Sequence, residues 1–217
     1  MKKGLTELVF ILDQSGSMSG LEKDTIGGFN SMLQKQKELD GECRITTVLF
    51  DNRYQLLHDR IDIRAVSPMT AEDYCAGGCT ALLDAIGRTV SKLAGVQRNT
   101  AEEYRAEKVM FVIITDGEEN ASREYSSQKV KAMIRREQEQ YGWEFIFLGA
   151  NIDAVETAAQ FGISADRAVD YVPDGAGTAL NFQAISETAA LFRSAAPMPQ
   201  APLAAIRRDM KRRGRRR

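Results

Sequence analysis

Six short stretches rich in apolar and β-branched residues recur along the chain, and they limit its fold more than any other feature. Longer segments with apolar residues at every third or fourth position separate them, which is the spacing of amphipathic helices. This alternation is typical of an α/β fold with a largely parallel sheet. The predicted strands are "ELVFIL" (7–12), "RITTVLF" (44–50), "YQLLHDRIDI" (54–63), "KVMFVIIT" (108–115), "EFIFLGA" (144–150) and "RAVDYV" (167–172).

The predicted strands differ in polarity, and this difference places them in the sheet. Segments 7–12, 108–115 and 144–150 are apolar on both alternating faces, as expected for strands covered by helices on both sides. Segment 54–63 is more polar and follows 44–50 after only "DNR", a gap that permits a hairpin but no crossover helix. We therefore predict a doubly wound, mostly parallel six-stranded sheet with one antiparallel edge strand and helices on both faces.

Four segments outside the strands carry apolar residues at helical spacing, and each is predicted to pack one face against the sheet. These faces comprise Ile26, Phe29, Leu33 and Leu39; Leu83, Ile86, Val90 and Leu93; Val130, Ile134 and Tyr141; and Phe182, Ile185, Ala189 and Phe192.

The chain divides into an acidic body and a basic end. The segment "RRDMKRRGRRR" (207–217) holds eight Lys or Arg and one Asp, whereas the other 206 residues carry 21 basic and 29 acidic side chains. From residue 195 onward the composition turns to Ala and Pro and then to Arg, which is typical of a linker and a solvated tail. We therefore predict one domain over 1–194, and a linker with a basic, disordered tail over 195–217.

Length and composition are those of a soluble globular protein. The chain has 217 residues, of which 43% are hydrophobic and 27% charged, and its apolar runs are too short to cross a bilayer. The N-terminal apolar run leads directly into Asp13 without an Ala-x-Ala cleavage pattern, so we interpret it as a strand. Three cysteines, an odd number without a secretory signal, favour reduced thiols and a cytoplasmic location.

Oxygen-bearing side chains gather where two predicted strands end. Asp13, Ser15 and Ser17 follow the first strand in "DQSGS", and Asp116 follows the fourth in "TDG". Thr80, in "GGCT", precedes a predicted helix whose first N–H groups carry partial positive charge. Because ligands of doubly wound sheets bind beyond the carboxyl ends of the strands, we expect these residues to converge there.

The five residues offer two carboxylates and three hydroxyls, which are hard oxygen ligands. This set suits Mg²⁺, or alternatively Mn²⁺ or Ca²⁺, and is a poor match for zinc or copper. The two carboxylates balance a divalent charge, and the neutral hydroxyls complete the coordination. Taken alone, "DQSGS" also fits a polar turn that caps a helix.

In these three motifs the sequence resembles the von Willebrand factor A (vWA) domain with its metal-ion-dependent adhesion site (MIDAS). The family pattern is Asp-x-Ser-x-Ser, then a Thr in a glycine-containing loop, then an Asp in Thr-Asp-Gly, and this chain has "DQSGS", "GGCT" and "TDG" in that order. The resemblance spans about residues 5–194. It extends to stand-alone bacterial vWA proteins, whose usual place is in multiprotein complexes.

The resemblance implies the strand order 3-2-1-4-5-6. It also implies a metal held by Ser15, Ser17 and Thr80, with Asp13 and Asp116 contributing directly or through water. One coordination position would stay open for a Glu or Asp carboxylate from a partner protein.

Other polar residues near these motifs have simpler interpretations. Asp84 either supports the site from behind Thr80 or, as we favour, faces the helix dipole as an exposed first-turn carboxylate. Glu118 and Glu119 are expected to be solvated, and Asp51 to belong to a hairpin turn. A zinc site at Cys75 and Cys79, with Cys43, would need His58, the only histidine, which is predicted in an edge strand on the other side of the molecule.

Together these patterns predict a metal-dependent protein-binding module rather than an enzyme. Two alternatives remain: a metal-dependent hydrolase on the same sheet, and an electrostatic tether in which the basic tail binds nucleic acid or an acidic partner. Catalytic motifs are lacking, because "GSMSG" departs from Gly-x-Ser-x-Gly and "DQS" lacks the second carboxylate of an Asp-x-Asp nucleophile motif.

Overall fold

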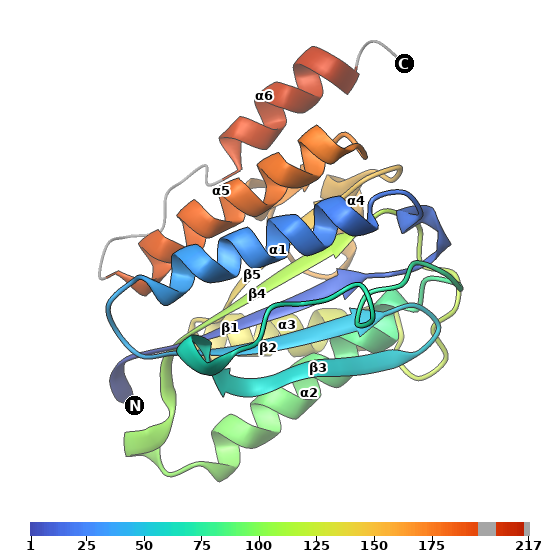
Figure 1. Cartoon of the computed structure of the whole chain (residues 1–217). Helices are drawn as coiled ribbons and strands as arrows, with labels where there is room; N and C mark the ends of the chain where they lie inside the picture. The colour runs from blue at the N-terminus through green and yellow to red at the C-terminus, as the bar shows by residue number, and fades with distance from the viewer. Residues whose placement is uncertain (195–202, 215–217) are drawn as a thin grey trace.

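One six-stranded sheet forms the centre of the computed structural model, which describes residues 1–194 and 203–214 (Figure 1). Its strand order is β3-β2-β1-β4-β5-β6, as predicted. The strands are β1 (Lys2–Asp13), β2 (Cys43–Phe50), β3 (Tyr54–Asp62), β4 (Ala106–Thr115), β5 (Glu144–Gly149) and β6 (Ala168–Asp170).

The register of the strands brings two of the predicted site residues to one edge. β1 runs parallel to both β2 and β4, with Leu12 opposite Ile114, so Asp13 and Asp116 leave neighbouring strands at the same edge. β3 pairs with β2 in the antiparallel direction through a tight hairpin, which confirms the predicted edge strand. Strand order reverses between β1 and β4, and ligands of open α/β sheets bind at such a point.

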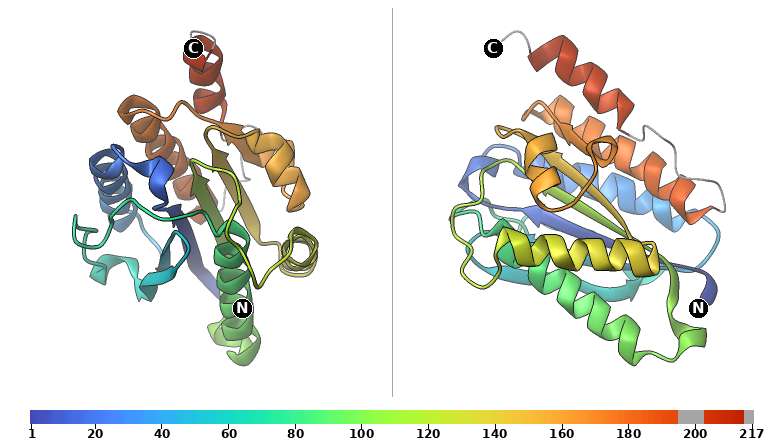
Figure 2. Two further views of the ribbon diagram at one scale, coloured as in Figure 1. Left: turned by 90° about the vertical axis from the view of Figure 1, so that its right-hand side faces the viewer. Right: turned by 180° about the vertical axis from the view of Figure 1, so that it is seen from behind.

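Helices cover both faces of the sheet (Figure 2). On one face α1 (Glu22–Lys37) and α5 (Gly175–Arg193) lie side by side, and the other face carries α2 (Leu82–Asn99), α3 (Ser127–Tyr141) and the short α4 (Ala154–Gln160). Single turns of 3-10 helix occur at Gly16–Met18, Ile63–Ala65, Glu102–Tyr104 and Ala165–Arg167. No described helix is both long and apolar enough to span a bilayer.

Burial on both faces explains why β1 is apolar at successive positions. Phe10 points to the α1 and α5 side, where it meets Phe29 edge-on at 5.6 Å between ring centroids. Its neighbours Val9 and Ile11 belong to the separate core on the α2 and α3 side. Successive side chains of a strand point to opposite faces, so a strand between two helical layers needs apolar residues throughout.

The basic end of the chain differs from the expected disordered tail. Ala204–Arg213 forms helix α6, which packs outside α5 and against β6 (Figure 1). Leu203 and Ile206 are buried in the core on that side, and this anchors the helix. The expectation is therefore wrong for residues 203–214, while 195–202 and 215–217 lie outside the described part of the chain.

Two arginines of α6 also find specific partners. Arg207 donates to the main-chain oxygens of Ala165 and Ala168, both at 2.8 Å. Arg213 forms an ion pair of 2.6 Å with Asp174, the N-cap residue of α5. These contacts engage positive charge that the composition suggested would be solvated.

Candidate metal centre

Three loops meet at the carboxyl edge of β1 and β4, and main-chain hydrogen bonds join them. The loop after β1 donates from Gly16 N–H to the oxygen of Gly78, at 3.1 Å. The loop after β4 donates from Asn120 N–H to the oxygen of Thr80, at 3.0 Å. The segment that carries Thr80 therefore contacts both of the segments that carry the two aspartates.

The Asp13 carboxylate is buried and held by hydrogen bonds. Its Oδ1 accepts from the N–H of Ser15 at 2.7 Å, and its Oδ2 accepts from the hydroxyl of Thr115 at 2.6 Å. The N–H of Asp116 lies 3.4 Å from the same Oδ2. Asp13 thus joins its own loop to the end of β4.

Short distances link the three predicted hydroxyl groups. Ser15 Oγ and Ser17 Oγ are 3.1 Å apart. A Cβ atom built on Gly117 would lie 3.2 Å from Ser17 Oγ and 3.3 Å from Thr80 Oγ1, so these two oxygens flank the residue that follows Asp116. Glycine at position 117 leaves room for both hydroxyls, because any side chain would push against them.

Asp116 has a partner that was not predicted. The side-chain amide of Asn151 donates to Asp116 Oδ1. Asn151 follows the end of β5 with a φ of 56°, a left-handed conformation that Asn tolerates better than most residues. Its position is a signal that could have been used, because a polar residue just beyond a third parallel strand must lie at the same edge.

Burial shifts the acidity of both aspartates upward. It raises the pKa of Asp116 to about 6, against the opposing hydrogen bond from Asn151 and with the help of the nearby Asp13 charge. Burial likewise raises the pKa of Asp13, although hydrogen bonds from Thr115 and Ser15 oppose this shift. Two buried carboxylates in close proximity disfavour each other's charge, and a bound divalent cation reverses that penalty.

The donor set therefore fits a hard divalent cation. Its members are Asp13, Ser15, Ser17, Thr80 and Asp116, which provide carboxylate and hydroxyl oxygens without sulfur or imidazole. Ser17 is exposed while Ser15 and Thr80 are buried, so the set faces solvent on one side.

Two nearby carboxylates have roles that differ from those expected. Asp84 accepts hydrogen bonds from the N–H groups of Arg123, Glu124 and Tyr125, all at 2.9 Å. These bonds lower its pKa below the ordinary value despite partial burial. The interpretation of Asp84 as a carboxylate that merely faces the helix dipole is therefore incomplete, because it holds the loop after β4.

Glu119 also joins these two segments, but here the acceptor carboxylate lies in the loop after β4 and the donor N–H lies in α2. It accepts from the N–H of Leu83 at 2.8 Å, and the hydroxyl of Ser122 accepts from the N–H of Asp84 at 3.0 Å. The expectation that Glu119 is solvated is therefore wrong. Its partner N–H lies in the first turn of α2, where Ala81, the residue before the helix, provides no side-chain cap.

His58 and the cysteines lie in different environments. His58 Nδ1 is 3.0 Å from Thr47 Oγ1, and the ring stacks on Phe29 in the core. Cys43 is buried, whereas Cys75 and Cys79 are exposed. Among the described residues, no group of three or more His, Cys, Asp or Glu side chains is arranged to hold a metal.

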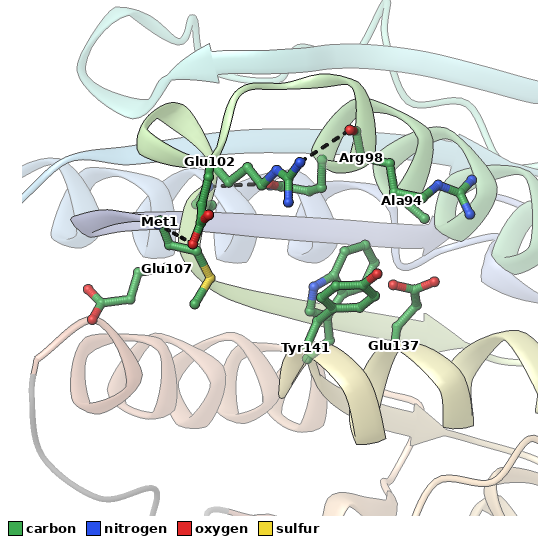
Figure 3. A pocket seen from close by; sticks show the side chains of 11 residues that line it. Met1, Ala94, Arg98, Glu102, Glu107, Glu137 and Tyr141 are labelled. Atoms are coloured by element: carbon green, nitrogen blue, oxygen red, sulfur yellow. Dashed lines mark hydrogen bonds and ion pairs between the residues drawn. The ribbon is translucent and has the colours of Figure 1, made fainter.

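A pocket of about 200 Å³ lies at the opposite end of the sheet (Figure 3). Glu137 and Tyr141 enter it from α3, and Glu102 points toward the N-terminal amine of Met1, 3.8 Å away. The Glu137 carboxylate is already bonded by Arg136. None of the five predicted site residues lines this pocket.

Solved structures support the fold, although their sequence identity to this chain is low. A scan against family models and a search of curated proteins found no match. A vWA protein from Catenulispora acidiphila has a similar structure, with 15% identity, a TM-score of 0.59, and coverage of 85% of this chain and 42% of that one.

Two further similar structures contain a metal ion. Proximal thread matrix protein 1 from the mussel byssus, with zinc in its MIDAS motif, shares 15% identity at a TM-score of 0.54, covering 85% of this chain and 46% of that one. Manganese-loaded TRAP protein from Plasmodium vivax shares 21% identity at a TM-score of 0.51, covering 69% and 58%. This chain spans about half the length of these proteins. The resemblance that the three motifs indicated is confirmed for the architecture: this chain has the fold of a von Willebrand factor A domain.

Proposed function

We propose that this chain is a protein-binding module in which a divalent cation bridges to a carboxylate of a partner. The cation is held by Asp13, Ser15, Ser17, Thr80 and Asp116. One observation carries the proposal: hydroxyl groups from two separate loops, those of Ser17 and Thr80, flank Gly117 directly after Asp116.

The chemistry of the donor set accounts for an anionic partner. Two carboxylates balance the charge of a divalent ion, and three neutral hydroxyls leave that ion with affinity for a further anion. The exposed Ser17 marks the side from which a Glu or Asp side chain reaches the ion. We propose Mg²⁺ as the resident ion, with Mn²⁺ or Ca²⁺ as alternatives.

The similar structures with zinc or manganese support a divalent cation in general. A cytoplasmic location and a bacterial origin belong to the same proposal, which rests on cysteine usage and on the resemblance to stand-alone bacterial vWA proteins. A Ser–His–Asp hydrolase is not part of it, because the ring of His58 is engaged with Thr47 in the core.

Thermal unfolding in chelator and in excess Mg²⁺ or Mn²⁺ tests the metal site. The metal is expected to raise the Tm of the wild type, and the Ser17→Ala and Asp116→Asn variants to lose most of that gain. Ser19→Ala is the matched control, since Ser19 is also exposed and lies two residues beyond Ser17. Equal metal-dependent gains in the wild type and in Ser17→Ala would refute the site.

A binding experiment tests the bridging role. Proteins that bind the immobilised chain in Mg²⁺ are expected to elute with chelator, to be retained by Ser19→Ala, and to be lost with Ser17→Ala. Binding that survives chelation but disappears when residues 207–217 are deleted would instead favour the electrostatic tether.

A further inference from the structure

A small cavity lies behind Asp13, on the core side of the candidate metal centre. Its volume is about 10 Å³, counted as the space that the centre of a water molecule can occupy. Residues of β1, β4, α1 and α5 contribute to its lining. Apolar side chains form part of its wall. The polar residues around it are Asp13, Thr25, Tyr171, Thr178 and Asn181.

Three polar atoms at this cavity are buried and accept no hydrogen bond from the described residues. They are Thr25 Oγ1, Thr178 Oγ1 and Asn181 Oδ1. Each of the three residues is at most 4% exposed. Buried polar side-chain atoms are nearly always hydrogen-bonded, so three such atoms around one cavity indicate a shared partner.

Other buried threonines in helices of this chain behave differently. The hydroxyls of Thr89 and Thr188 donate to the main-chain oxygen four residues earlier, at 2.7 Å in each case. Thr25 and Thr178 also lie in helices, α1 and α5, but their hydroxyls make no such bond and line the cavity instead. The contrast shows that these two hydroxyls are turned toward a partner other than their own helix.

Two tyrosine hydroxyls near the cavity are committed to main-chain oxygens. Tyr74 donates to the oxygen of Asp13, and its own hydroxyl oxygen can receive the proton of Thr25, which leaves Thr25 Oγ1 free to accept. The hydroxyl of Tyr171 donates to the main-chain oxygen of Thr115 at 3.4 Å. Neither tyrosine proton is therefore available for Asn181 Oδ1.

We infer that one water molecule is bound in this cavity and bridges α1 to α5 directly behind Asp13. The available space matches the roughly 10–15 Å³ that one water needs, and the three oxygens provide the two to four partners typical of buried water. The water donates one hydrogen to Asn181 Oδ1 and accepts from the hydroxyl of Thr178. Its second hydrogen goes to Thr25 Oγ1. This site is distinct from the metal centre and does not depend on the proposed function.

A high-resolution crystal structure of the wild type, grown in chelator, tests the inference. A density peak at hydrogen-bonding distance from both Asn181 Oδ1 and Thr178 Oγ1 is expected. Density without such a peak, with the Thr178 hydroxyl turned to the main-chain oxygen of Asp174, would overturn it.

Counting long-lived waters by water-¹⁷O relaxation dispersion, again in chelator, gives an independent measure. The double variant Thr178→Val/Asn181→Leu is expected to lose one long-lived water relative to the wild type, whereas Thr178→Ser keeps it. An unchanged count in a double variant whose near-UV circular dichroism is native would refute the site. Because both measurements exclude metal, failure of the proposed metal-binding function would leave them unaffected.

Discussion

The carboxylate of Glu119 accepts a hydrogen bond from the main-chain N–H of Leu83, at 2.8 Å. Glu119 lies three residues after Asp116, and Leu83 lies three residues after Thr80. The bond therefore joins the two loops that supply the second and third motifs of the candidate metal centre. Asp84 strengthens this connection by accepting three N–H groups from residues 123–125.

Loss of the Glu119 bond is expected to weaken metal binding while the fold is retained. Groups that orient metal ligands without touching the metal typically change affinity by about tenfold or more when mutated. We expect Glu119→Gln to raise the Kd for Mg²⁺ roughly tenfold, measured by isothermal titration calorimetry. Glu118→Gln removes the same charge from the adjacent exposed residue and is expected to leave the Kd unchanged. Equal losses in both variants would indicate a general charge effect instead.

Gly117→Ala is expected to abolish most of the metal-dependent gain in Tm. The added Cβ would press on Ser17 Oγ and Thr80 Oγ1 from 3.2 and 3.3 Å, and both hydroxyls would have to move. Gly27→Ala is the control, because a Cβ there meets no atom within 4 Å and alanine favours the helix by about 0.5–1 kcal/mol. Thermal unfolding with and without Mg²⁺ measures both. A full metal-dependent gain in Gly117→Ala would contradict the close approach of the three loops.

The effect of metal on stability is expected to depend on pH. Asp116 has a pKa of about 6 in the folded chain against an ordinary value of 3.8, so the metal-free folded form binds the proton more tightly than the unfolded form. This group therefore makes the metal-free protein less stable as pH rises from about 4 to about 6. A cation competes with that proton, so the Tm gain from Mg²⁺ should be larger at about pH 7.5 than at about pH 5.

Tm measurements at both pH values, in chelator and in Mg²⁺, check this expectation. Asp116→Asn, which cannot titrate, is expected to flatten the metal-free pH dependence that this group contributes. A metal gain of the same size at both pH values would show that Asp116 is not a site of competition between proton and metal.

Ile206→Ala is expected to release α6 from the body of the protein. Replacing a buried Ile with Ala costs about 2–5 kcal/mol, which is large compared with the roughly 0–1 kcal/mol of a partly exposed ion pair such as Arg213–Asp174. Because α6 is rich in arginine, limited trypsin digestion followed by mass spectrometry reports its release. Arg208→Ala, at an exposed position of the same helix, should not accelerate cleavage at the remaining sites.

Local patterns predicted the sheet and the elements that carry the candidate site. The apolar runs and the short "DNR" gap indicated the strands and the antiparallel edge, because side-chain periodicity and connection length act within a few residues. The position of Asp13 and Asp116 directly after parallel strands indicated that they share an edge. Asn151 follows β5 in the same way, and applying that argument to a third strand would have identified it.

The residues with wrong or incomplete predictions have partners far away in the chain. Asp84 and Glu119 are both acidic residues near a helix start or in a loop, and their local surroundings fit a dipole contact or a solvated charge equally well. Their bonds cross 36 to 41 residues, so no local pattern contains them. The end of the chain was predicted from its charge, although two apolar side chains, Leu203 and Ile206, decide where it packs.

Periodicity and strand-end chemistry in the chain were thus enough to specify a doubly wound sheet and the oxygen-bearing side chains that follow its central strands, because both follow from the geometry of a single strand or helix. Four other features arise only once the chain is folded. They are the hydrogen bonds between the Thr80 and Asp116 loops, the bond from the Asn151 amide to Asp116, the proposed water site behind Asp13 and the docking of α6. Each of them satisfies a buried polar or apolar group with a partner that folding, rather than sequence proximity, brings within reach.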